Sequence, residues 1–190
     1  MSKSLSNLVS MQSDQIIIER FQEGAEKEQH FTELVKRHQQ KLYYQIKRMV
    51  IEHADADDIA QIVWMKVWEK LDGFKMESEF STWLFRIGYN ETINFIQKKK
   101  KLAIVHPTES SDGSIHEAST SNGPKSSQIQ IKLDQAIMQL PEKQRFVFML
   151  RYFEELPYEK IAQITETSIG GAKANFHQAL KKMQEIIQPD

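Results

Sequence analysis

The sequence has no cysteine, few glycines and prolines, and no long apolar run. Zero Cys among 190 residues excludes disulfides, thiolate metal sites and thiol nucleophiles, and it fits a reducing compartment. No stretch approaches the roughly 18 apolar residues that a membrane span needs, and the amino end, MSKSLSNLVSMQSDQ, lacks the apolar core of a signal peptide. These absences predict a cytoplasmic protein.

The chain also lacks an excess of either positive or negative charge. Lys and Arg number 25 against 26 Asp and Glu, so any nucleic-acid surface must come from local clustering of charge. The composition, with 40% hydrophobic and 27% charged residues, is that of a soluble globular protein, and the length allows one domain or two small ones.

Catalytic and metal-binding patterns are also lacking. The six His are dispersed and form no HExxH pair. Asp55, Asp57 and Asp58 form an acidic cluster, but a calcium loop starting at Asp55 needs Gly and Glu where Ala60 and Lys66 stand. Helix capping explains the cluster better. We expect no enzyme, no metal and no cofactor.

The few glycines and prolines divide the chain. Residues 102–127 are rich in Ser, Gly and Pro, are acidic, and show no apolar periodicity after Val105. So long a stretch without structure is unusual inside one compact domain. It predicts a flexible linker between two helical domains, over residues 1–101 and 128–190.

The apolar residues of the first domain recur at three- and four-residue steps, and no strand pattern competes with them. This spacing predicts four helices: one over 14–22 that stops at Gly24, one along Phe31 to Met49, one that Asp55 caps and that ends near Gly73, and one from Phe80 into lysines 98–101.

The second domain contains a predicted helix-turn-helix. Pro157 can open a short helix, Ser168 can cap a longer one, and a polar turn at 165–167 joins them. The amino-terminal residues of such a second helix can face base edges in a major groove; Lys173 suits phosphate or guanine and Asn175 suits adenine. A plain three-helix protein-binding bundle is the alternative.

A block of four lysines, Lys98 to Lys101, stands near the end of the fourth predicted helix. Arg86 precedes it, beside Trp83 and Tyr89, and interleaved cations and aromatic rings can hold phosphates and stack unpaired bases. The alternatives are a solvated helix end for the lysines and core packing for Trp83.

Several motifs follow one another along almost the whole chain: DADDIAQIVWMKVWEKL, then F-x5-F-S-T-W-L-F-R-I-G-Y-N, the lysine block, LPEKQRFVFMLRYFEELPYEKIAQI and SIGGAKANFHQALKKM. In this order they resemble a bacterial RNA polymerase sigma factor of the extracytoplasmic-function group of the sigma-70 family. That family is all-α, with a region two domain, a region four domain and a bare linker between them.

The resemblance implies partners and roles. Core RNA polymerase would be bound by Asp58, Gln61 and Trp64. The melted minus-ten element of promoter DNA would be held by Lys75, Phe80, Trp83, Arg86, Asn90, Lys98, Lys99, Lys100 and Lys101. The minus-thirty-five element would face Ser168, Gly171, Lys173, Asn175 and His177. The family also leaves room for an anti-sigma factor.

Some positions depart from the family pattern. Ile62 stands where Glu is usual, which predicts a rearranged polymerase contact. Glu166 replaces the usual turn glycine and predicts a different turn, because Glu tolerates positive φ poorly. Asn175 and Gln178 stand where Arg is frequent, which predicts weak promoter contact.

Two other functions remain open at this point. A stand-alone helix-turn-helix regulator would explain residues 128–190 but leaves the first domain without a purpose. A helical adaptor that binds only proteins would explain both domains but makes the lysine block and Arg86 incidental.

Overall fold

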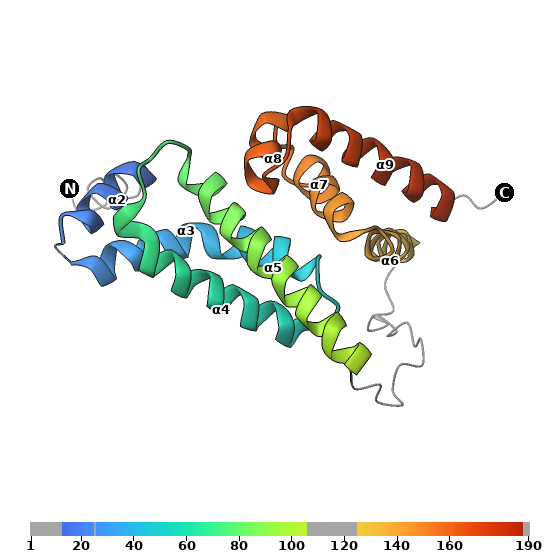
Figure 1. Cartoon of the computed structure of the whole chain (residues 1–190), viewed down its shortest axis with the longest axis horizontal. Coiled ribbons are helices and arrows are strands. Elements are labelled where there is room, and N and C mark those ends of the chain that lie inside the picture. Colours follow the sequence, from blue (N-terminus) through green and yellow to red (C-terminus); the bar gives the residue numbers. More distant parts are fainter. Residues whose placement is uncertain (1–12, 25, 106–124, 188–190) are drawn as a thin grey trace.

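The computed structural model describes residues 13–24, 26–105 and 125–187, and every element in these ranges is a helix (Figure 1). The first domain comprises α2 (Asp14–Gln22), α3 (Lys27–Lys47), α4 (His53–Lys70), the 3-10 helix η1 (Leu71–Gly73) and α5 (Phe80–Val105). The second comprises α6 (Lys125–Met138), α7 (Glu142–Tyr152), α8 (Tyr158–Thr165) and α9 (Ile169–Ile187). The predicted all-α class is confirmed.

The predicted linker over 102–127 coincides with the break between these two sets of helices. Its first residues still belong to α5, which runs to Val105, and its last belong to α6, which begins at Lys125; the remainder lies outside the described residues. None of the described helices is both long and apolar enough to cross a bilayer.

The predicted helix ends are confirmed at α2 and corrected at α4. Ser13 Oγ accepts a hydrogen bond from the Ile16 amide at 3.5 Å, and Gly24, with φ 89°, follows α2. In contrast, α4 begins at His53 with Glu52 as its N-cap, so the prediction that Asp55 caps this helix is wrong. Asp55 lies in the first turn, and its carboxylate pairs with Lys99.

The first domain packs around the apolar face of α4. Ala56, Ile59, Val63 and Val67 are all buried, at steps of three and four residues. Burying a side chain such as Ile59 stabilises the fold by roughly 1.5–3 kcal/mol. On α5, Gly88 allows a close approach to α3, because a Cβ at this position would lie 2.8 Å from Leu42 Cδ1.

The helix-turn-helix is confirmed as α8 and α9, but its turn differs from the prediction. Glu166 adopts the left-handed conformation, φ 52° and ψ 45°, and its amide donates to the Ala162 carbonyl. The glutamate therefore occupies the backbone conformation that suits glycine, at a cost of about 1–2 kcal/mol for a residue with a Cβ. The expectation of a different turn was wrong.

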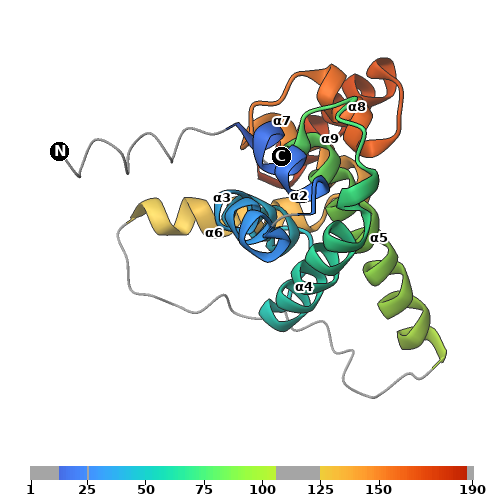
Figure 2. The ribbon, with the colours of Figure 1, turned by 90° about the vertical axis from the view of Figure 1, so that its left-hand side faces the viewer.

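The two domains pack against each other, which the sequence did not predict. One buried apolar cluster contains residues of both domains, and the Tyr89 and Phe146 rings lie 4.6 Å apart across the boundary. A second, smaller cluster joins α6, α7 and α9. In Figures 1 and 2 the helices α7 and α8 lie beside the amino-terminal half of α5.

Candidate nucleic-acid interface

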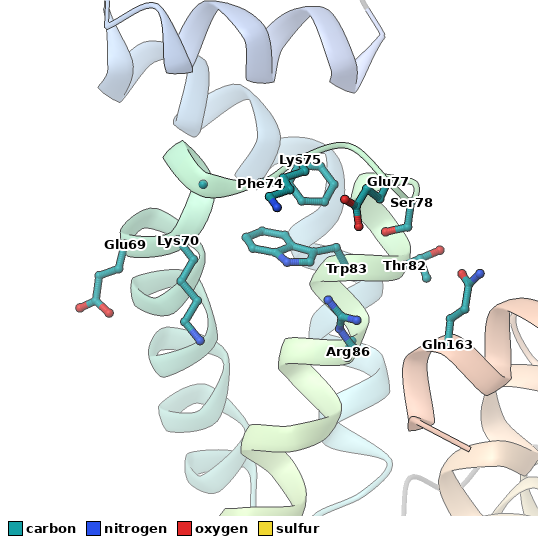
Figure 3. Close-up of a pocket in the computed structure, with 11 residues that line it drawn as sticks. Glu69, Lys70, Phe74, Lys75, Glu77, Ser78, Thr82, Trp83, Arg86 and Gln163 are labelled. Atoms are coloured by element: carbon teal, nitrogen blue, oxygen red, sulfur yellow. The ribbon is translucent and has the colours of Figure 1, made fainter. Parts of the chain in front are cut away.

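A cavity of about 640 Å³ lies in the first domain, between the end of α4, the following loop and the start of α5. Aromatic rings, cations and short polar side chains line it (Figure 3): Glu69, Lys70, Gly73, Phe74, Lys75, Glu77, Ser78, Thr82, Trp83, Arg86 and Gln163. The cavity thus brings together three of the predicted minus-ten residues, Lys75, Trp83 and Arg86. Asn90, one turn beyond Arg86 and half-buried, is outside its wall.

The indole of Trp83 is the largest aromatic surface of the cavity. It is half-buried, and its ring lies 4.7 Å from the Phe74 ring at 33°, so Phe74 supports one side of the indole. Phe80 is only 4% exposed and packs 5.9 Å from Trp83 and 5.1 Å from the His38 ring. A buried ring cannot reach DNA, so Phe80 is corrected from a DNA contact to a support for Trp83.

Charged and polar groups surround this indole. In Figure 3 the Arg86 side chain lies below Trp83 and the Lys75 side chain lies beside Phe74. Ser78, Thr82 and Gln163 add hydrogen-bond donors and acceptors to the wall. An aromatic face with nearby cations can stack an unpaired base and attract its phosphate. Sequence reasoning missed Thr82 and Gln163, because neither side chain carries a charge or an aromatic ring.

Two members of the lysine block are already in ion pairs. Lys99 Nζ lies 2.8 Å from Asp55 and 2.9 Å from Glu52, and these hydrogen bonds, that to Asp55 first, raise its pKa. Lys100 pairs with Glu142 of the second domain, and this contact is the main cause of the lowered pKa of Glu142. Among the described residues, Lys98 and Lys101 have no acidic partner.

The position of the block also differs from the prediction. Helix α5 continues past it to Val105, so the lysines lie within the helix instead of at its end. Their charges therefore do not lie beside the terminal carbonyl groups, and the alternative of a solvated helix end loses the support of the helix dipole.

The exposed side of α4 carries the predicted polymerase-binding residues. Asp58 and Gln61 are exposed, whereas Trp64 is half-buried and packs edge-on against Phe31 at 5.9 Å. Ile62 and Met65 are 40% and 57% exposed on the same helix, so the surface is more apolar than expected. The three-residue step from Ile59 predicts that Ile62 belongs to the buried stripe of this helix, and that prediction is wrong.

The predicted minus-thirty-five residues gather at the start of α9. Ser168 Oγ accepts a hydrogen bond from the Gly171 amide at 3.0 Å, which confirms Ser168 as the cap. Lys173 is exposed, with Nζ 5.7 Å from the Tyr158 ring centre, and His177 is exposed one turn later. Asn175 is half-buried, and its amide donates to the Gly171 carbonyl at 2.9 Å, so the helix itself uses one of its donors.

Comparison with known proteins matches both domains. The family model of sigma-70 region 2 matches residues 34–102, and that of sigma-70 region 4 matches residues 130–183. The ECF RNA polymerase sigma factor SigW of Bacillus subtilis is 31% identical, with 83% of this chain and 89% of SigW covered. The ECF RNA polymerase sigma-E factor of Escherichia coli is 30% identical, with 93% of this chain and 95% of that factor covered.

A solved structure is similar as well. It is that of the sigma factor RpoE of Bartonella quintana in complex with the anti-sigma factor NepR. This chain matches it with a TM-score of 0.66 and 27% identity, over 84% of this chain and 98% of the solved one.

Proposed function

Because this chain belongs to the extracytoplasmic-function group of bacterial sigma-70 factors, we propose that its first-domain cavity holds an unpaired base of the minus-ten element. As a sigma factor it directs RNA polymerase to specific promoters at transcription initiation. Since both domains match the family, neither a stand-alone helix-turn-helix regulator nor a purely protein-binding adaptor explains the chain.

The arrangement around Trp83 carries the proposal. Phe74 supports the indole from one side, Arg86 and Lys75 supply positive charge nearby, and the volume of about 640 Å³ lies in the range of small-molecule sites. Extruding a base costs a few kcal/mol, and stacking on an aromatic side chain returns about 1–3 kcal/mol. Capture of the base would therefore convert spontaneous opening of the duplex into a stable bubble.

Open-complex formation by reconstituted holoenzyme tests this assignment. Trp83→Ala should reduce it about 5- to 150-fold, which corresponds to the loss of one stacking contact. The defect should persist on a template whose minus-ten bases are already mismatched, because the contact is to the unpaired base. Tyr152→Ala, an exposed aromatic residue outside the cavity, is the matched control. Normal opening by Trp83→Ala would refute the assignment.

We propose further that Asp58, Gln61 and Trp64 contact core polymerase. Asp58 and Gln61 are exposed and off the buried face of α4, so changing them leaves the core intact. The double variant Asp58→Ala, Gln61→Ala should compete poorly for core enzyme, whereas Gln39→Ala, Gln40→Ala, also exposed on a neighbouring helix, should compete normally. Equal competition by both would contradict the assignment.

We propose that Ser168, Gly171, Lys173, Asn175 and His177 face the minus-thirty-five element. These residues share the amino-terminal part of α9, which is the part of a recognition helix that reaches base edges. Ser168 and Gly171 would act chiefly by shaping the helix start, and the exposed Lys173 and His177 by reaching the DNA.

We propose that the protein works without catalysis, in the cytoplasm, where polymerase and promoter DNA are found. Binding energy directed at an unpaired base is sufficient for promoter opening and requires no reacting side chain. The similarity to a sigma factor solved with an anti-sigma factor also supports an anti-sigma partner for this chain.

A further inference from the structure

A histidine of α3 lies behind the aromatic side of the first-domain cavity. The Nε2 atom of His38 lies 2.7 Å from a carboxylate oxygen of Asp14 on α2. The centre of the imidazole lies 5.1 Å from that of the Phe80 ring on α5, edge-on at 68°. The His38 side chain is 13% exposed and does not line the cavity, so it cannot touch a base held there.

Packed rings connect this histidine to the indole of Trp83. The Phe80 ring lies 5.9 Å from Trp83 and 6.3 Å from Phe74, and the Phe74 ring lies 4.7 Å from Trp83. Two phenyl rings therefore support the indole, and the His38 imidazole packs against one of them. Protein interiors contain few voids and transmit strain, so a displaced imidazole would displace Phe80 and, with it, the indole.

Asp14 fixes the orientation of the imidazole. Its other carboxylate oxygen lies 3.3 Å from Nη1 of Arg37, which also pairs with Glu33. The hydrogen bond with His38 is the main cause of the lowered pKa of Asp14, and burial partly offsets it. An ionised carboxylate only accepts hydrogen bonds, so Nε2 of His38 carries the hydrogen and donates it. The imidazole is thus held by α2 while its ring contacts α5.

We propose that His38 is a positioning residue for Trp83, and that its hydrogen bond to Asp14 keeps the aromatic stack in the orientation that accepts an unpaired base. This role depends on the proposed function of the cavity. A stacking surface that is already ordered loses less conformational freedom when the base arrives, so it binds the base more tightly. His38 would thereby promote promoter opening without touching DNA.

Fluorine NMR of the full chain labelled with 5-fluorotryptophan tests the position of the indole directly. The chain has three Trp residues, and Trp64, which packs against Phe31, is the internal reference for correct folding. His38→Leu keeps an apolar side chain beside Phe80 but cannot donate to Asp14. It should shift or broaden the Trp83 signal and leave the Trp64 signal unchanged.

His30→Leu is the matched control for this measurement. His30 is half-buried on the same helix, and its side chain has no hydrogen bond or ring contact among the described residues. This variant should leave the Trp83 signal unchanged. An unchanged Trp83 signal in His38→Leu, or an equal change in both variants, would overturn the proposal.

Promoter opening by reconstituted holoenzyme tests the functional effect. His38→Leu should slow open-complex formation about three- to thirtyfold, which lies within the range of coupling between neighbouring side chains. Competition for core enzyme should stay within about twofold of wild type, since distant sites act independently. Equal losses in both measurements would identify a general loss of folding and would overturn the positioning role.

Two variants of Asp14 test the hydrogen bond. Both Asp14→Asn and Asp14→Ala remove the charge that pairs with Arg37, but only Asn keeps an oxygen that can accept the His38 N–H. Asp14→Asn should open promoters within about twofold of the wild-type rate, whereas Asp14→Ala should show most of the loss seen in His38→Leu. Equal losses in the two Asp14 variants would overturn the role of the hydrogen bond.

A double variant separates failure of this role from failure of the cavity assignment. If His38 acts through the indole, His38→Leu should change the rate of opening by less than about twofold in a Trp83→Ala chain. A further loss as large as in the wild-type background would overturn the positioning role and leave the cavity assignment intact. If Trp83→Ala alone does not slow opening, the cavity assignment fails, and the role of His38 in opening fails with it.

Discussion

The two DNA-reading regions of this molecule are built in opposite ways. The first is a cavity in which a half-buried indole is supported by packed rings and bordered by cations, and we propose that it holds an unpaired base. The second is the exposed start of α9, where short residues leave room for Lys173 and Asn175 to approach a duplex. The first region depends on the rings that pack behind the indole, and the second depends on side chains that stay exposed to solvent.

Two helical glycines give the largest expected contrast between these regions. Gly88 allows α5 to approach α3, and a Cβ there would meet Leu42 Cδ1 at 2.8 Å, so Gly88→Ala should destabilise the first domain by about 1–3 kcal/mol. At Gly170 a Cβ would meet only Ser168 Oγ, at 3.9 Å, so Gly170→Ala should stabilise α9 by up to about 1 kcal/mol. Urea unfolding followed by circular dichroism measures both, and a loss of stability at Gly170 would contradict the contrast.

Replacing a base-reading side chain of the second region should change promoter preference at a single base pair. Losing a good base contact costs about 1–3 kcal/mol at one base pair, so Asn175→Ala should change preference at one upstream promoter position. Since its amide already donates to the Gly171 carbonyl, we expect the lower part of this range.

Lys173→Ala is the matched comparison on the same helix. It should weaken all promoters similarly if the ammonium group touches only phosphate. Transcription from a promoter library distinguishes the two variants. An unchanged preference profile for Asn175→Ala would exclude base reading by that residue.

The lysine block should contribute less to DNA binding than four charges suggest. Each phosphate contact adds about 0.7 to 0.9 to the slope of log affinity against log salt. Lys98 and Lys101 have no acidic partner among the described residues, so Lys98→Ala, Lys101→Ala should flatten the slope of holoenzyme by up to about 1.4 to 1.8.

The paired lysines provide the comparison for this measurement. If Lys99 keeps Asp55 and Glu52 and only Lys100 is released from Glu142, replacing all four lysines should add at most about 0.7 to 0.9 more. A total near 3 to 4 would show that DNA breaks every pair. No change in slope would identify the block as a solvated helix surface.

The sequence predicted what depends on local pattern. The stop at Gly24 and the Ser168 cap follow from short-range signals, and both are confirmed. Periodicity predicted most of the buried stripe of α4, but Ile62, which it also placed there, is exposed. The burial of Phe80 and the pairing of Lys100 with Glu142 join residues far apart in the chain. Neither could be predicted from spacing, because each depends on how whole helices pack.

The smallest expected effect concerns how each region ends a helix. α2 is followed by Gly24, which takes its left-handed conformation without strain, whereas α8 ends at Glu166 with φ 52°. Glu166→Gly removes a strain of about 1–2 kcal/mol but increases the entropy of the unfolded chain, which returns roughly 0.5–1 kcal/mol. We therefore expect a net stabilisation of about 0.5–1 kcal/mol, measured as a rise in the urea midpoint at constant slope.

Glu166→Ala removes the same charge but keeps a Cβ, so it should give no such gain. Equal stabilisation by both variants would assign the effect to the charge of Glu166 and not to the backbone of the turn. Burial is the main reason why the pKa of Tyr89 is raised, and the charge of Glu166 adds to it.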